Sequence, residues 1–375
     1  MKRLTRAAVL ATATALALAA CAAAPEAKPT TSTSAGGGAS ASATTSDYTA
    51  CMVSDEGGFD DASFNQSGFE GLNKAKDDLG INVKSAESAD PGQYVDNVDS
   101  MVQAKCNLII GVGFALEDAI QAAAEANPDI NFALVDSAFS DKDFKPVTLP
   151  NAKPLLFNTQ ESAYLAGYLA AGTTKTGTVA TYGGMPFPSV TIFMDGFVDG
   201  VAAYNTDNGT SVKVLGWDKA AQNGSMIGNF SDTEAGRTTT EQFIAAGADV
   251  ILPVAGPVGA GSLNAASQAP GTSVIWVDSD GYLQAANADF KQLILTSVIK
   301  QIGTAVYDTI ADAAKGNYTA DPYVGTLKNG GVDLAPLHDF ESKVDPALVS
   351  KIDELKQKII SGELKVESPS ANATS

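Results

Sequence analysis

The chain has 375 residues, of which 43 are acidic and 24 are basic, and its formal net charge at pH 7 is −19. This excess of negative charge argues against a nucleic-acid partner, which requires basic surface to displace the counterions of the phosphate backbone. The length allows two domains of ordinary size.

The first residues predict an export signal. Three of the first six residues are basic, and an apolar stretch follows over residues 7–20. That stretch is too short to span a bilayer as a stable helix, and its layout is typical of an export signal. Small residues precede Cys21, so we interpret residues 18–21 as a lipobox in which Cys21 receives a diacylglyceryl group. The alternative is an ordinary signal with a chance cysteine.

Residues 21–47 are predicted to be a flexible tether. They consist mainly of Ala, Pro, Lys, Thr, Ser and Gly. Such a segment has too few apolar side chains to offset the entropy of ordering, so it would hold the folded body off the membrane. Acylation of the amino terminus would supply more than one lipid chain, as stable anchoring requires. The tail at residues 367–375 is also expected to be loose.

Short apolar runs rich in Val, Ile and Leu recur along the body of the chain and predict strands. Because the runs are nearly continuous rather than alternating, both faces of each strand should be covered, which is typical of a parallel sheet between helices. The runs are Tyr48–Val53, Leu108–Val112, Asn131–Val135, Thr178–Tyr182, Val212–Leu215, Val250–Val254 and Val274–Val277.

Helical spacing appears between these runs, at residues 94–102 and 119–123. Small residues form a stripe over residues 163–171, where a helix can approach its neighbour closely. Near the end of the chain, Asp345 and Pro346 predict the start of a helix with one apolar face that reaches Ile359. Alternating strands and helices indicate an α/β fold.

The number of strands is too large for one compact half, so we predict two doubly wound lobes with parallel sheets. The first lobe would comprise residues 48–157 with 284–320, and the second residues 158–283 with 321–366. The late segment holds a strand at Leu293–Leu295, a helix near residues 300–315 and two extended pieces. Such a segment suits a chain that crosses back between lobes through a three-stranded hinge.

Two cysteines remain in the body of the chain, Cys51 and Cys106. An exported protein meets an oxidising compartment, and the first and third strands are neighbours in a 2-1-3-4-5 sheet, so a disulfide is possible. Two buried free thiols are the alternative.

Polar residues and glycines follow the predicted strands at their carboxyl ends, where open α/β sheets bind ligands. Asp55 lies after the first strand, Asp136 after the run that ends at Val135, Gly256 after Val254, and Asp278 after Val277. A carboxylate accepts two hydroxyl hydrogen bonds, and glycine lets a ligand approach the backbone. These residues suit a neutral, hydroxyl-rich small molecule.

The sequence argues against an enzyme. Its one histidine, His338, has no catalytic motif around it, and we interpret it as a surface or hinge residue. No zinc-type Cys/His cluster, P-loop or complete dinucleotide fingerprint is present, so neither a metal nor a cofactor is expected. Carboxylate pairs such as Asp60 with Asp61, or Asp278 with Asp280, could in principle hydrolyse a glycosidic bond, but an Asp before a turn more often caps a helix.

Several motifs in order resemble the basic membrane protein family of lipoproteins. These are purine-nucleoside-binding relatives of the type I periplasmic binding proteins, and the resemblance covers nearly the whole body. The matching segments are Ser54–Gln66, Gly111–Phe114, Ala163–Ala170, Gly228–Asp232, Gly247–Ile251, Val277–Asp280 and Leu295–Lys300.

The resemblance implies an aromatic sandwich in which Phe64 and Phe230, from opposite lobes, stack on the two faces of a purine. Stacking on an aromatic ring stabilises a bound base by ~1–3 kcal/mol. The resemblance further implies hydrogen bonds from the base edge to Asn65 and Asp136, with Asp55 beside them. The ribose hydroxyls would be held by Asp278, Lys300 and the backbone near Gly256.

Each of these residues also has a plainer interpretation. Phe64 could be a hydrophobic staple, Asn65 a helix N-cap, Phe230 a core residue and Lys300 a solvated residue at a helix start.

The chain departs from the family pattern at three places. Gly281 follows the Asp-Ser-Asp motif where many relatives carry Gln. Glu56 adds a carboxylate where small or apolar residues are usual. The loop over residues 219–227 is longer than the minimal version.

We therefore predict a monomeric, lipid-anchored binding protein on the extracytoplasmic face of the cell membrane. It would close two lobes on a nucleoside and present the closed form to an ABC permease and its ATPase. The alternatives are a sugar or autoinducer receptor of the same fold and a surface regulatory lipoprotein without a transport role.

Overall fold

A computed structural model describes residues 47–143 and 145–372 of the chain. The predicted signal peptide, Cys21 and the predicted tether up to residue 46 lie outside the described residues. None of the helices among the described residues is long and apolar enough to cross a membrane.

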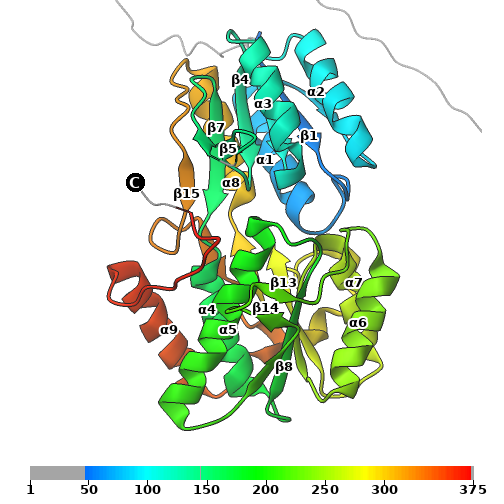
Figure 1. Cartoon of the computed structure of the whole chain (residues 1–375), viewed down its shortest axis with the longest axis vertical. Helices are drawn as coiled ribbons and strands as arrows, with labels where there is room; N and C mark the ends of the chain where they lie inside the picture. The colour runs from blue at the N-terminus through cyan, green and yellow to red at the C-terminus, as the bar shows by residue number, and fades with distance from the viewer. Residues whose placement is uncertain (1–46, 144, 373–375) are drawn as a thin grey trace, which may run out of the picture. The chain divides into compact units, whose positions relative to one another are not determined.

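The first lobe is a six-stranded parallel sheet with the strand order β2-β1-β3-β4-β7-β15 (Figure 1). Its first five strands follow the predicted 2-1-3-4-5 order. The strands are β1 (Thr49–Ser54), β2 (Asn82–Ala86), β3 (Leu108–Val112), β4 (Asn131–Val135), β7 (Ala152–Phe157) and β15 (Tyr323–Gly325). The helices of this lobe are α1 (Phe64–Leu79), α2 (Tyr94–Gln103), α3 (Glu117–Ala126) and α8 (Ile302–Ala314).

The second lobe repeats this plan with the order β9-β8-β12-β13-β14-β16, in which only the pairing of β14 with β16 is antiparallel. The strands are β8 (Thr178–Gly183), β9 (Lys213–Leu215), β12 (Val250–Val254), β13 (Ser273–Asp278), β14 (Ile294–Lys300) and β16 (Val332–Leu334). The helices are α4 (Gln160–Thr173), α5 (Pro188–Asn208), α6 (Thr233–Ala245), α7 (Gly259–Ser267) and α9 (Pro346–Ser361).

Two short antiparallel pairs complete the strands. They are β5 (Phe139–Ser140) with β6 (Pro146–Val147) and β10 (Trp217–Asp218) with β11 (Asn223–Gly224).

Each central strand is buried on both faces, as the continuous apolar runs predict. In β1, Ala50 and Met52 join the hydrophobic cluster that includes residues of α1 and α8, whereas Cys51 and Val53 join the cluster that includes α2 and α3. Successive side chains of a strand point to opposite faces, so a strand between two helical layers must be apolar at every position. The predicted α/β fold with parallel sheets is confirmed.

The small residues of α4 allow close packing on α5. A Cβ atom added at Gly167 would lie 2.1 Å from the backbone oxygen of Phe197, and one added at Gly200 of α5 would lie 2.0 Å from the backbone oxygen of Tyr164. Since real Cβ contacts are never this short, any larger residue would force the two helices apart. This contact accounts for the small-residue stripe at residues 163–171.

The chain passes from one sheet to the other between β7 and α4, between β14 and α8, and between β15 and β16. Strand pairing differs from the predicted lobe boundaries at two of these places. β14 pairs with β13 in the second sheet rather than the first, and β15 pairs with β7 in the first sheet rather than the second. Both lobes offer an apolar edge strand there, so local composition does not show which sheet a crossing strand joins.

Cys51 and Cys106 are joined in a disulfide with a Cα–Cα distance of 6.0 Å. Cys51 lies in β1, and Cys106 lies just before the neighbouring β3. The disulfide therefore ties adjacent strands of the first sheet.

The carboxyl-terminal segment is more ordered than predicted, since residues 368–372 form hydrogen bonds. Ser368 donates to Asp195 at 2.6 Å, and the Asn372 side chain donates to the backbone oxygen of Phe157 at 3.0 Å. The prediction of a loose tail is wrong for these residues because their short polar side chains pair with buried polar groups.

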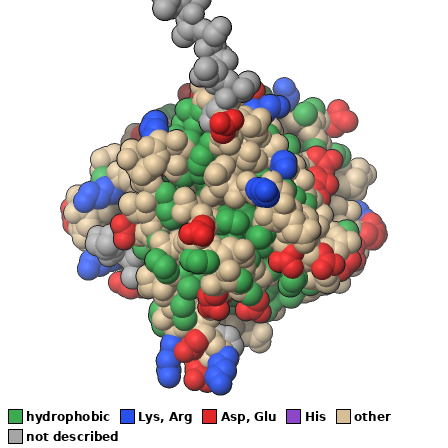
Figure 2. Space-filling view, turned by 90° about the horizontal axis from the view of Figure 1, so that it is seen from above, with side chains coloured by type: hydrophobic (Ala, Val, Ile, Leu, Met, Phe, Trp, Pro, Cys, Tyr) green, Lys and Arg blue, Asp and Glu red, His purple; other side chains and the backbone are tan. Residues whose placement is uncertain are grey.

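Charged side chains are dispersed on the face shown in Figure 2. Acidic and basic residues lie there among hydrophobic and uncharged polar ones, and several acidic side chains lie close together at the right of the view.

Candidate functional site

A cavity lies between the two lobes at the carboxyl ends of their strands, and side chains from both lobes line it. It brings together every residue that the sequence singles out as a ligand contact. These are Asp55, Phe64, Asn65 and Asp136 from the first lobe, and Phe230, Gly256, Asp278 and Lys300 from the second.

Asp61 positions the start of α1 at the edge of this cavity. Its carboxylate accepts hydrogen bonds from the backbone N–H groups of Ser63, Asn65 and Gln66, at 2.9 to 3.0 Å. These groups are the unpaired donors at a helix start, so Asp61 takes the capping role. The interpretation of Asn65 as a mere N-cap is therefore wrong. Asp60 is exposed and does not line the cavity.

Asn65 and Asp55 form a polar pair inside the cavity. The Asn65 amide donates to the Asp55 carboxylate at 3.0 Å, and burial raises the pKa of Asp55 to about 8. A buried carboxylate loses its hydration, so the neutral acid is favoured. The amide oxygen of Asn65 is buried and has no hydrogen-bond partner among the described residues. It is thus an acceptor open to a donor on a ligand.

Gly113 makes room for this pair. Its φ of +119° is in a region that side chains rarely adopt, and a Cβ atom added there would lie 1.8 Å from an Asp55 carboxylate oxygen. The glycine of the Gly111–Phe114 motif is therefore needed where Asp55 packs against the backbone.

Lys300 forms a buried ion cluster with Asp136 and Asp278. Its ammonium contacts the Asp136 carboxylate and lies 3.4 Å from that of Asp278. Burial by itself opposes the charge of the lysine, but the two carboxylates outweigh it and raise the pKa of Lys300. The Lys300 side chain is 3% exposed, so its interpretation as a solvated residue is wrong.

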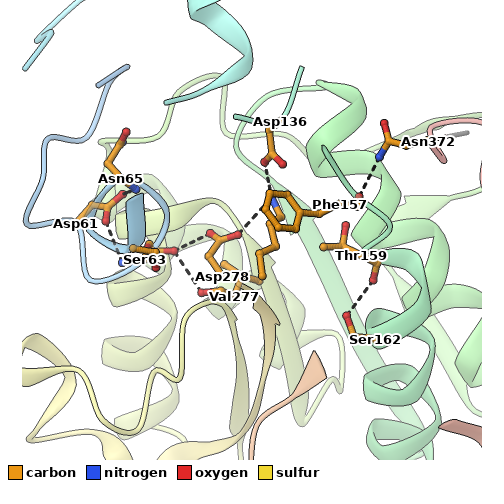
Figure 3. Close-up of polar contacts among 12 residues, drawn as sticks. Asp61, Ser63, Asn65, Asp136, Phe157, Thr159, Ser162, Val277, Asp278 and Asn372 are labelled. Carbon is orange, nitrogen blue, oxygen red and sulfur yellow. Dashed lines mark hydrogen bonds and ion pairs between the residues drawn. The ribbon is translucent and has the colours of Figure 1, made fainter. Parts of the chain in front are cut away.

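Asp136 and Asp278 occupy equivalent places in the two lobes. Each lies at the carboxyl end of a strand, in a Val-Asp-Ser sequence, with a left-handed backbone, at φ +66° and +68° respectively. Both carboxylates therefore turn toward Lys300. Figure 3 labels Asp136 and Asp278.

The aromatic residues Phe64 and Phe230 are both half-buried and line the cavity from opposite lobes. The ammonium of Lys300 lies 5.0 Å from the centre of the Phe64 ring, a cation–π distance. The ring of Phe230 lies against the backbone of Gly184, where an added Cβ would come within 2.3 Å of it. Phe230 therefore lines the cavity and also packs against the hydrophobic core.

Three more phenylalanines line the cavity, and the sequence did not single them out. Phe114 stacks on Phe187 across the lobes with ring centres 4.8 Å apart, and Phe187 lies 6.0 Å from Phe230. Phe193 of α5 lies under Lys300 at 4.9 Å. Phe114 ends the Gly111–Phe114 motif, which was the available signal. Phe187 precedes a helix start at Pro188 and has no such context.

Hydrogen bonds join the two lobes around the cavity. The Ser63 hydroxyl donates to the Asp278 carboxylate at 2.8 Å, and the Ser231 hydroxyl donates to Glu56 at 2.8 Å (Figure 3 shows the first). The free volume of the cavity is about 60 Å³, below the ~300–1,000 Å³ of typical ligand pockets. A ligand that fills a pocket of typical volume must therefore enter while the lobes are further apart.

The three departures from the family pattern have structural roles. Glu56 accepts the inter-lobe hydrogen bond from Ser231. Gly281 packs on Trp276, since an added Cβ would lie 2.4 Å from its ring, so a larger residue does not fit. The longer loop forms the β10–β11 hairpin, and Gln222 in it donates to Asp195 at 2.9 Å.

His338 lies outside the lining of the cavity, as a hinge or surface residue would. Its ring is 2.8 Å from the Asp280 carboxylate and stacks on Tyr282 with centres 4.0 Å apart. Within residues 47–143 and 145–372, no group of three or more His, Cys, Asp or Glu residues is arranged to hold a metal ion.

Comparison with known proteins identifies a family. Residues 48–370 match the family model described as "ABC transporter substrate-binding protein PnrA-like". The "ABC transporter nucleoside-binding protein BmpA" of Lactococcus lactis subsp. cremoris is 34% identical, and the match covers 86% of this chain and 90% of that protein. "Basic membrane protein A1" of Borrelia garinii subsp. bavariensis is 30% identical, with 83% of this chain and 86% of that protein covered.

A solved structure has a similar fold. It is an ABC transporter system solute-binding protein from Aeropyrum pernix K1, with a TM-score of 0.76 and 26% sequence identity. The similarity covers 86% of this chain and 94% of that one. The two lobes described above therefore have the arrangement of a solute-binding protein.

Proposed function

Because the chain belongs to the PnrA-like family of ABC transporter substrate-binding proteins, also represented by the basic membrane proteins, we propose that it captures purine nucleosides for an ABC importer. It binds the nucleoside between two closing lobes and releases it unchanged to a permease that is driven by its ATPase. The protein is monomeric and is held at the extracytoplasmic face of the membrane through lipid on Cys21.

The observation that carries this proposal is the cavity itself. Eight residues from distant segments of the chain, each expected from the sequence to contact a ligand, line one space between the lobes. Two of them are aromatic rings on opposite lobes, Phe64 and Phe230. A planar base between two rings gains stacking energy on both faces. Aromatic stacking is the usual way in which proteins hold an unpaired base.

The polar residues complement the edges of a nucleoside. The unpartnered amide oxygen of Asn65 accepts a hydrogen bond from the base, and Asp136 accepts a second one. The carboxylate of Asp278 accepts from ribose hydroxyls, and Lys300 donates to a ribose oxygen while it keeps its ion pair with Asp136. Backbone near Gly256 approaches the sugar because glycine carries no side chain.

Charge in the cavity favours a nucleoside over a nucleotide. Lys300 is the one cationic residue in the described lining, and it is already paired with two carboxylates. The other ionisable groups, such as Asp55 and Glu56, are acids. A phosphate would bring negative charge into this acidic, partly desolvated space, which is costly without a free cation.

Closure of the lobes serves as the signal to the permease. The bonds from Ser63 to Asp278 and from Ser231 to Glu56 join the lobes beside the ligand cavity. A closed ligand-bound form differs in its surface from an open one, and a permease that binds only the closed form would import only loaded protein. This mode of action needs tethering and no catalytic group.

The test is the binding of ligands to the soluble body, from about Ser46 onward. Thermal unfolding with nucleosides, free bases, sugars and amino acids should show a raised midpoint for adenosine, guanosine or inosine, because a ligand of the native state stabilises it by mass action. Calorimetry should then show that Phe64→Ala and Phe230→Ala each weaken binding about 5- to 160-fold, the equivalent of ~1–3 kcal/mol of stacking.

Phe340→Ala is the matched control, since Phe340 is half-buried like the two site residues but does not line the cavity. It should leave affinity unchanged. A midpoint shift with a pentose or hexose alone would move the function to sugar binding. No shift with any ligand would favour a regulatory lipoprotein without a transport role.

A further inference from the structure

A second cavity of about 310 Å³ adjoins the first one. The two share three lining residues, Phe114, Asp136 and Ser189. The residues assigned to the ribose, such as Gly256 and Asp278, line the first cavity and not the second. The passage between the cavities therefore lies at Asp136, on the side of the proposed base edge.

The second cavity is mainly apolar and contains no cation. Rings and aliphatic side chains, among them Phe139, Phe157 and Ile192, make up much of its lining, and no Lys or Arg is among its described lining residues. Two carboxylates line it. Glu117 already accepts hydrogen bonds at 2.7 Å from the hydroxyls of Ser137 and Ser140, and Asp136 is paired with Lys300. An uncharged group fits this space, whereas a phosphate does not.

One polar group in this lining has no partner. Thr159 is fully buried at the start of α4, and its hydroxyl makes no hydrogen bond to any described residue. Figure 3 shows Thr159 beside Phe157, near the segment that ends at Asn372. Buried hydroxyls are nearly always hydrogen-bonded, so this one points to a polar atom on something that enters the cavity.

We propose that the second cavity is a subsite of the nucleoside site and takes an uncharged substituent at position 6 of the purine. This inference rests on the proposed function, because Asp136 marks the base end only if a nucleoside is the ligand. The substituent passes beside the Phe114 ring and lies against the apolar wall. A hydroxyl on it would pair with Thr159.

The test compares parent nucleosides with their substituted forms by calorimetry. Adenosine is paired with N6-benzyladenosine, and guanosine with O6-benzylguanosine. For the parent that binds, the benzyl form should keep an affinity within about tenfold of it, because contact with the apolar wall offsets the base-edge N–H that the substitution removes. The 5′-monophosphate should bind more than about tenfold more weakly than the parent. A loss of more than 100-fold on adding the benzyl group would overturn the subsite.

Ala138→Trp should fill the second cavity, because Ala138 is exposed and lines only that cavity of the two. This change should weaken the binding of the benzyl form at least tenfold and the binding of the parent less than threefold. Ala220→Trp, at another exposed alanine that lines neither cavity, should change the affinity for neither form. Equal losses for parent and benzyl form in Ala138→Trp would contradict the proposal.

Thr159→Val gives a second measurement that leaves the size of the side chain unchanged. It should weaken the binding of N6-(2-hydroxyethyl)adenosine about fivefold relative to that of N6-ethyladenosine. If the two ligands are affected equally, the Thr159 hydroxyl has no role and the polar part of the proposal is overturned. If neither adenosine nor guanosine binds the unaltered protein, the proposed function fails and the subsite with it. If a parent binds and its benzyl form does not, the subsite alone fails.

Discussion

Replacement of Lys300 with methionine tests the buried ion cluster. The change keeps an apolar chain of similar length but removes the cation between Asp136 and Asp278, whose side chains are 6% and 8% exposed. Removing one partner of a buried ion pair typically costs about 3–5 kcal/mol, because the remaining charge is buried without compensation. For a folded body of this size, with an unfolding entropy of about 2.1 cal/mol/K per residue, that cost corresponds to a midpoint lowered by about 4–7 °C.

The ion cluster makes the stability of the folded protein depend on pH. Ion pairing raises the pKa of Lys300 in the folded state, so its contribution to stability is fully present below the unfolded pKa of about 10.4 and is lost as pH rises through the higher folded value. Between pH 5 and 9 the unaltered protein therefore keeps this contribution. In the variant, Asp136, whose pKa burial already raises, would take up a proton as pH falls, so the deficit should narrow toward pH 5.

The assay is thermal and urea unfolding of both proteins at pH 5, 7 and 9. Lys213→Met, at an exposed position of β9, is the control for loss of a lysine charge and should shift the midpoint by less than 2 °C. A Lys300→Met midpoint at pH 7 within 2 °C of the unaltered protein would refute this account of the cluster. A deficit that does not change with pH would refute the role of the carboxylates.

Three further predictions concern other parts of the molecule. Asp55→Asn should raise the free energy of unfolding by urea at pH 9 but not at pH 4. The folded pKa of Asp55, raised to about 8, makes the unaltered protein lose stability as pH rises from about 4 to 8. Equal gains at both pH values would contradict this. Ser231→Ala should speed nucleoside release about 2- to 12-fold in stopped-flow measurements, since it removes the bond to Glu56 worth ~0.5–1.5 kcal/mol, and no added effect is expected in a Glu56→Ala background. Alanine at both Cys51 and Cys106 should lower the free energy of unfolding by about 4 kcal/mol, as expected for opening a 55-residue loop, and the variant should no longer respond to reductant.

Much of the site was predictable because parallel strands place their carboxyl ends at one edge. Asp55, Asp136 and Asp278 each follow an apolar run, so their gathering follows from the strand order. Phe64, Asn65, Phe230 and Lys300 came from the family resemblance, and Gly256 came from both the resemblance and its position after a strand. All of them line the cavity.

Other elements carried no local signal. Strand β2 is largely polar and exposed at the sheet edge, so its sequence lacks an apolar run. The segment at residues 368–372 resembles a disordered tail in composition, yet it is held by hydrogen bonds to α5 and to the crossing near Phe157. Partners distant in sequence decide both cases.

The sequence by itself determined the alternation of strands and helices, the two lobes and the gathering of Asp55, Asp136 and Asp278, because burial on both faces and strand-end position are local properties. Only the tertiary structure decided which sheet β14 and β15 join, and which groups meet across the lobes. The stacking of Phe114 on Phe187 and the bond between Glu56 and Ser231 join residues far apart in the chain, by 175 positions in the second case. Such contacts depend on how two separately folded lobes meet, and no periodicity within either lobe encodes that.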